Sequence, residues 1–144
     1  MCIRDSACAG WGLAGAAELT PIEDAKAQFN TNFWGAVRVV NAALPRLRAR
    51  GGGHVVLMSS IGGILGIPYQ AFYSASKFAL EGYAESLAYE VAPFNIHVTL
   101  VEPGNFKTDF TAARKKVCLL YTSPCARTTA RSMTFWSWRT LPGQ

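Results

Sequence analysis

The sequence predicts an α/β fold built on a doubly wound parallel sheet. Residues 54–60 form an apolar run that is typical of a buried strand, and residues 96–101 form a second such run. The sequence between them favours a helix, and strand, helix and strand in that order indicate a right-handed βαβ unit. In open parallel sheets, ligands bind outside the carboxyl ends of the strands. We therefore expect the functional site where these two runs end.

An amphipathic helix is predicted ahead of the first strand. Thr20 suits the N-cap position and Pro21 the first helical position. Asn32 is the exception on the apolar face: it is either a buried amide satisfied by a local backbone hydrogen bond or part of the functional site. The apolar residues of this face recur at spacings of three and four; they are Phe29, Phe33, Val37, Val40, Leu44 and Leu47.

The candidate site centres on Tyr73 and Lys77. Residues four apart lie on the same face of a helix, with roughly 5–6 Å between their Cβ atoms. An ammonium beside a phenol favours the phenolate, so we expect Lys77 to lower the pKa of Tyr73 below its usual value of about 10. Such a tyrosine can exchange a proton near neutral pH. Ser60, at the end of the first strand, should lie at the same sheet edge.

Four motifs of this sequence resemble those of the short-chain dehydrogenase/reductase family. Ala7-Cys8-Ala9-Gly10 is similar to the family's Asn-Asn-Ala-Gly turn, although Ala7 and Cys8 replace the two asparagines. The other motifs are carried by residues that match the family's helix asparagine, its catalytic serine with the Tyr-x-x-x-Lys pair, and its Pro-Gly-x-x-x-Thr nicotinamide loop. These residues are Asn32, then Ser60, Tyr73 and Lys77, then Pro103, Gly104 and Thr108.

The resemblance implies a Rossmann-like oxidoreductase that transfers a hydride between NAD or NADP and an alcohol or carbonyl substrate. It implies that Tyr73 is the acid/base, Ser60 orients the substrate oxygen, and Lys77 binds the nicotinamide ribose and lowers the tyrosine pKa. Asn32 would hold a water that contacts the lysine. The implied cofactor-binding residues are Ala9, Gly10, Tyr73, Lys77, Pro103, Gly104, Phe106 and Thr108.

The sequence also gives expectations about the substrate and the oligomeric state. Residues 62–72 line the implied pocket and are mostly apolar, which hints at an apolar carbonyl compound; the apolar residues are Ile64, Leu65, Ile67, Tyr69 and Phe72. Small residues form a ridge on the helix after Tyr73, which could pack on the sheet or approach a second subunit; they are Ala75, Ala79, Gly82 and Ser86. Family members commonly dimerise, so the resemblance implies a homodimer or homotetramer.

The two ends of the chain look foreign to the domain. Residues 1–6 and 118–123 can be encoded by strings that are reverse complements apart from their terminal bases, which resembles a sequencing-library adaptor read in both directions. We therefore expect the domain to span residues 7–116, with 1–6 and 117–144 non-native and the tail outside the fold. The family's glycine-rich pyrophosphate turn and the residue that selects NAD or NADP do not match anything here, nor do its first βαβ units and its final helix and strand. We expect the chain as written to be inactive by itself.

Composition excludes several function classes. The tail carries three arginines and no acid, so its removal lowers the net charge from +5 to +2, and the basic character then gives no argument for nucleic-acid binding; we expect no nucleic-acid partner. Of the four cysteines, only Cys8 lies within residues 7–116, which suits a reduced, cytoplasmic enzyme rather than a disulfide scaffold. No apolar run reaches the length of a membrane span. His54 and His97 lack partners at metal-ligand spacing, so we expect no metal.

Two alternatives stay open. An extended-type sugar-nucleotide epimerase or dehydratase also uses Tyr-x-x-x-Lys, but the Pro-Gly-x-x-x-Thr loop is less typical of that class. A non-catalytic nucleotide-binding or scaffold relative would have no physical need for a proton relay through Asn32, Ser60, Tyr73 and Lys77.

Overall fold

The computed structural model describes residues 8–105, 109–117 and 136–140. The helical elements, in chain order, are η1 (Ala17–Leu19), α1 (Ile22–Phe29), η2 (Asn30–Gly35), α2 (Ala36–Ala49), η3 (Ile61–Gly63), α3 (Ala71–Val91) and η4 (Ala92–Phe94). The strands are β1 (Leu13–Ala14), β2 (Gly53–Met58), β3 (Ile96–Pro103), β4 (Lys115–Lys116) and β5 (Trp136–Thr140).

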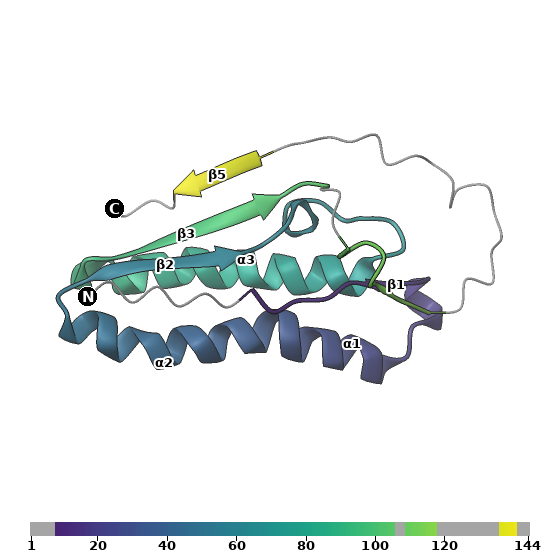
Figure 1. Cartoon of the computed structure of the whole chain (residues 1–144), viewed down its shortest axis with the longest axis horizontal. Helices are drawn as coiled ribbons and strands as arrows, with labels where there is room; N and C mark the ends of the chain where they lie inside the picture. The colour runs from purple at the N-terminus through teal and green to yellow at the C-terminus, as the bar shows by residue number, and fades with distance from the viewer. Residues whose placement is uncertain (1–7, 106–108, 118–135, 141–144) are drawn as a thin grey trace.

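The predicted β–α–β arrangement is confirmed. Strands β2 and β3 pair in parallel, from Gly53 opposite Ile96 to Met58 opposite Val101, and α3 connects them (Figure 1). Their carboxyl ends therefore meet at one edge, where Ser59 donates its backbone N–H to the Val101 carbonyl at 2.8 Å. The α/β class with a parallel sheet follows from this unit.

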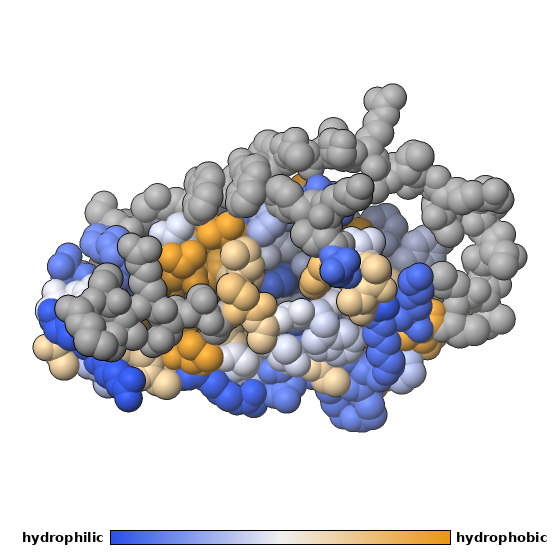
Figure 2. Space-filling view, viewed as in Figure 1, coloured by the Kyte–Doolittle hydropathy of each residue, from blue (hydrophilic) through white to orange (hydrophobic). Residues whose placement is uncertain are grey.

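Both long helical segments lie on one face of this sheet. Side chains alternate along β2, so Val55 and Leu57 enter the core while Val56 stays 60% exposed. The core joins β2 and β3 to α2 through Val40 and to α3 through Leu80, Ala84, Leu87, Ala88 and Val91. Within the described residues the opposite face carries exposed apolar side chains, and Figure 2 shows apolar surface over the sheet.

The amphipathic helix has the predicted apolar face but a different beginning. Phe33, Leu44 and Leu47 pack against the core that contains Val40. However, the Thr20 hydroxyl donates to the Ala16 carbonyl at 2.8 Å, and the N-cap position is occupied by Pro21. The prediction of Thr20 as the N-cap is therefore wrong. A threonine hydroxyl can bond to backbone groups that precede or follow it, and here it bonds to the residue that precedes the 3-10 helix η1.

A π-helical segment separates α1 from α2. This segment, η2, runs from Asn30 to Gly35 and contains the buried Asn32. Single π-turns of this kind often mark functional sites, because they add a residue without ending the helix. Here the segment brings a polar residue to the buried face of an otherwise apolar helix.

Two pairings involve the end of the chain. Lys115 and Lys116 of β4 lie parallel to Leu13 and Ala14 of β1. Strand β5 pairs antiparallel with β3, with Thr140 opposite Thr99. The expectation that the tail adds nothing to the fold is therefore wrong for residues 136–140. Strand β5 thus covers the edge of β3 that faces away from β2, and an uncovered strand edge pairs readily with an extended segment.

Candidate active site

Tyr73 and Ser60 meet at the carboxyl end of β2. Ser60 follows the strand in extended conformation, and its hydroxyl accepts the Gly62 backbone N–H at 3.1 Å. Tyr73 lies in the first turn of α3, is 6% exposed and forms a side-chain hydrogen bond with Ser60. The structure thus brings these two predicted site residues together.

Lys77 is buried one turn after Tyr73. Only 6% of the residue is exposed, and its ammonium donates to the Met58 carbonyl, the last of β2, at 2.8 Å. A buried ammonium needs acceptors to offset its lost hydration. The strand-end carbonyl supplies one and fixes the side chain at the sheet edge.

The acid–base properties differ from the expectation for Tyr73. Burial raises the pKa of Tyr73 above 10.0, and this outweighs the lowering by the Ser60 hydrogen bond and by the charge of Arg114. The expected lowering by Lys77 is therefore wrong for the structure described, because spacing along a helix does not reveal how deeply a phenol is buried. Burial also lowers the pKa of Lys77 to about 8, although the charge of Glu81 acts in the opposite direction.

Asn32 links the helix to the predicted cofactor turn. Its carboxamide oxygen accepts the Trp11 backbone N–H at 3.0 Å, and its nitrogen donates to the Trp11 carbonyl at 3.1 Å. The same nitrogen lies 3.3 Å from the Ser76 hydroxyl, which donates to the Tyr73 carbonyl at 2.7 Å. The backbone partner is thus 21 residues away in sequence, not local. Asn32 therefore connects the Trp11 loop to the helix that carries Tyr73.

The implied cofactor-binding residues fall into two groups. Ala9 and Gly10 lie exposed in the loop that Asn32 holds, and a Cβ at Gly10 would stand 3.4 Å from the Asn32 carboxamide oxygen. Pro103 ends β3 at the same sheet edge and Gly104 follows it. Phe106 and Thr108 lie outside the described residues.

These residues fit a nicotinamide nucleotide chemically. The Lys77 ammonium is a donor and the Tyr73 hydroxyl both a donor and an acceptor, which suits the hydroxyls of a ribose. The backbone of the Ala9–Gly10 turn is open to approach. Within the described residues, no cluster of three or more His, Cys, Asp or Glu side chains could hold a metal ion.

Sequence reasoning missed two glycines beside the site. A Cβ at Gly62 would lie 3.1 Å from Cε1 of Tyr73, and a Cβ at Gly63 would lie 2.7 Å from the Ser59 hydroxyl. A side chain at either position would therefore press on its neighbours, which glycine avoids. The signal that could have found these positions is the glycine pair soon after Ser60.

Sequence reasoning also missed the burial of Glu81. This residue is only 8% exposed, while Glu85 and Glu90 of the same helix are exposed. The spacing of four residues from Lys77 already placed it on the Lys77 side of the helix.

The segment after β3 reaches the site as well. The ring of Phe110 lies 6.0 Å from the Tyr73 ring, centroid to centroid, and the Arg114 guanidinium lies 6.0 Å over the Phe110 ring. Nothing in the local sequence indicated this contact, because it depends on the return of the chain from β3 to β1. Among the helices of the described part, none combines the length and hydropathy of a membrane span.

Comparison with known proteins places this geometry in a family. Residues 6–118 match the family described as short chain dehydrogenase. A 3-ketodihydrosphingosine reductase from Bacteroides thetaiotaomicron is 56% identical over 106 residues, which cover 74% of this chain and 39% of the relative. The chain thus spans about two fifths of that relative's length.

Solved structures agree. A short-chain dehydrogenase from Streptomyces avermitilis superposes with a TM-score of 0.71 at 42% identity, over 76% of this chain and 42% of the other. A gluconate 5-dehydrogenase from Burkholderia cenocepacia, solved with NADP and tartrate, gives 0.71 at 25% identity, over 74% and 42%. Since the family match covers most of the sequence, the chain belongs to the short-chain dehydrogenase family.

Proposed function

We propose that this chain carries the catalytic segment of an oxidoreductase that interconverts an alcohol and a carbonyl compound with NAD or NADP. The observation that carries the proposal is the arrangement of Tyr73, which is hydrogen-bonded to Ser60 and one helical turn from the buried Lys77. All three lie at the carboxyl edge of parallel strands, where ligands bind in such folds. The NADP of the gluconate 5-dehydrogenase structure supports the cofactor class.

The residues divide the chemistry between them. The bound nicotinamide supplies or accepts the hydride. In the direction of reduction, the Tyr73 hydroxyl gives its proton to the carbonyl oxygen, and Ser60 donates a hydrogen bond that orients this oxygen. Lys77 holds the ribose, and its charge stabilises the tyrosinate that forms. Asn32 orders a water through which the proton is replaced.

The fit of NAD or NADP rests on a further set of residues. Ala9, Gly10, Pro103 and Gly104 would supply backbone contacts, and Phe106 and Thr108, which lie outside the described residues, complete the proposed set.

We propose an apolar carbonyl compound as the substrate. Apolar side chains follow Ser60 and are half exposed, with Ile64 and Leu65 at 49% and Tyr69 at 50%. The relative from Bacteroides is named as a 3-ketodihydrosphingosine reductase, which supports a carbonyl substrate. An alcohol of the same class is the substrate in the reverse direction.

We also propose that the complete enzyme is a homodimer or homotetramer in the cytoplasm. The small-residue ridge of α3 supports self-association, because Ala75, Gly82 and Ser86 are exposed rather than packed on the sheet. A Cβ at Gly82 would meet no atom within 4 Å. Analytical ultracentrifugation of the full-length enzyme tests the point, and a monomer alone would contradict it.

The decisive experiment is oxidation of NADH or NADPH by the full-length enzyme with a panel of ketones. Tyr73→Phe keeps the ring but removes the proton, so it should reduce kcat by at least about 10²-fold. Tyr89→Phe is the matched control, because Tyr89 lies on the same helix but is 59% exposed. Full activity of Tyr73→Phe would refute the role of this tyrosine. None of the comparisons favours an extended-type epimerase or a scaffold, and both would fail to oxidise the cofactor with simple ketones.

A further inference from the structure

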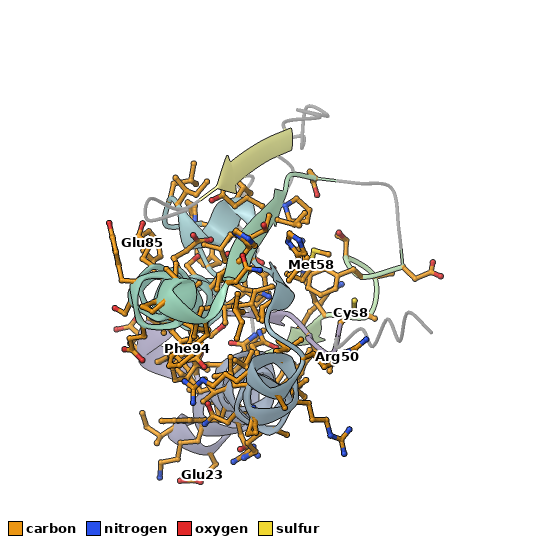
Figure 3. All side chains as sticks on the ribbon, turned by 90° about the vertical axis from the view of Figure 1, so that its left-hand side faces the viewer. Cys8, Glu23, Arg50, Met58, Glu85 and Phe94 are labelled. Carbon is orange, nitrogen blue, oxygen red and sulfur yellow. The ribbon has the colours of Figure 1, made fainter. Side chains whose placement is uncertain are left out.

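A second buried ionisable residue lies on the same helix as Lys77. Glu81 follows Lys77 by one helical turn on α3 and is 8% exposed. Glu85, one turn further, is exposed, and in Figure 3 it points outward from α3. A carboxylate is seldom buried unless nearby groups favour its charge. The contrast between these neighbours indicates a specific role for Glu81.

The absence of a side chain at Gly63 leaves space for the Glu81 carboxylate. A Cβ at Gly63 would lie 3.0 Å from the Glu81 Oε1 atom and 3.1 Å from its Cγ. Gly63 belongs to η3, the turn that begins directly after Ser60. The Glu81 side chain therefore occupies the space between α3 and the turn that positions the serine.

The charges around Lys77 act unequally. On α3 itself stand Tyr73 and Glu81; on the other elements of this sheet edge, Glu102 is buried near the end of β3, and the Arg114 guanidinium lies over the Phe110 ring. Burial disfavours the Lys77 ammonium, and Glu81 is the charge that favours it. The Arg114 charge acts instead on Tyr73. A neutral lysine would lose both its hold on a ribose hydroxyl and its stabilisation of a tyrosinate.

We propose that Glu81 is a positioning residue for the reaction, whose buried carboxylate keeps Lys77 charged and directed to the Met58 carbonyl at the sheet edge. The inference rests on the proposed function, since it assigns Glu81 to the same proton-transfer site. Glu81 itself touches neither substrate nor cofactor in this assignment and acts through Lys77.

The test compares pH profiles of the full-length enzyme and its Glu81→Gln variant. Removal of the charge should let Lys77 lose its proton at lower pH, so the alkaline limb of kcat should move down by about one pH unit. The loss of activity should then be larger at pH 9 than at pH 6. Glu81→Asp, which restores the charge, should recover part of the shift. Glu85→Gln is the matched control and should leave the profile in place.

A direct readout separates this inference from the proposed function. NMR titration of ¹³Cε-labelled lysine follows Lys77 without turnover, and its pKa should fall in Glu81→Gln. By reciprocity, Lys77→Met should raise the pKa of the Glu81 carboxyl, which tests the coupling even where Glu81→Gln does not fold. Unchanged titrations would overturn the inference. An unmodified enzyme that transfers no hydride, but shows both shifts, would refute the proposed function and leave the coupling standing.

Discussion

The ammonium of Lys77 donates to the carbonyl of Met58 at 2.8 Å, which ties helix α3 to the end of strand β2. This bond explains how a lysine can be only 6% exposed at the carboxyl edge of the sheet. It also fixes the distance between the helix and the strand end, because a shift of either would leave the ammonium without this acceptor. The position of Lys77 is thus set by the sheet as well as by the helix.

The burial of Lys77 should make it a destabilising residue at neutral pH. Its pKa is lowered to about 8 in the fold, so the charged form costs free energy below pH 8. In the full-length enzyme, Lys77→Met should raise the free energy of unfolding at pH 7 by about 1–3 kcal/mol. Urea denaturation measures this value.

The stability gain of Lys77→Met should depend on pH. Between pH 8 and about 10.5 the unfolded chain holds the lysine proton and the folded chain has lost it, so the unmodified enzyme gains stability as pH rises. The advantage of Lys77→Met should therefore shrink over this range. A variant that is less stable than the unmodified enzyme at pH 7 would contradict the assignment.

Gly62 should control the position of the Tyr73 ring. A Cβ there would lie 3.1 Å from Cε1 of Tyr73 and 3.2 Å from Cδ1 of Ile67, so the ring must move by a few tenths of an ångström in Gly62→Ala. Small misplacements of a catalytic group are costly, and kcat should fall by about 10-fold. Gly66→Ala is the control, because a Cβ there meets no atom within 4 Å. Equal activity of the two variants would argue against a close fit at Tyr73.

Asn32 should stabilise the loop that precedes β1. Asn32→Ala leaves the Trp11 N–H without its acceptor, while the Trp11 carbonyl keeps its bond from Gln28 at 3.1 Å. The variant should lose about 1–3 kcal/mol of stability. Amide hydrogen exchange at Trp11 should accelerate, whereas Asn41→Ala, on the exposed side of α2, should leave it unchanged. Unaltered exchange in Asn32→Ala would show that another group fixes the loop.

Local patterns explain which parts of the fold could be predicted from the sequence. The apolar runs of β2 and β3 and the stripe from Phe33 to Leu47 depend on periodicities that any buried strand or helix must obey. The pairing of Tyr73 and Lys77 on α3 depends only on helical geometry. Features of this kind can be predicted without knowing which segment packs against them.

The rest depended on contacts between distant segments. The helical spacing from Lys77 indicates the side of α3 on which Glu81 lies, but its burial also depends on the approach of η3, whose Gly63 lies against it. The direction of the Tyr73 pKa follows from burial, which spacing does not encode. Thr20 is a residue type that often caps helices, but its hydroxyl donates to the preceding Ala16 carbonyl instead of capping the helix that follows.

The π-helical segment Asn30–Gly35 has a consequence for how sequences of this kind can change in length. One residue turns a helix by about 100°, so a single-residue deletion in η2 would rotate α2 against α1 by that angle. Gln28 and Asn32 could then no longer reach the same Trp11 carbonyl while Val40 stayed in the core. A chimera with a gap in η2 would therefore lose the hydrogen bonds to Trp11 or turn the apolar face of α2 away from the core. A gap in the exposed turn around Gly66 would do neither.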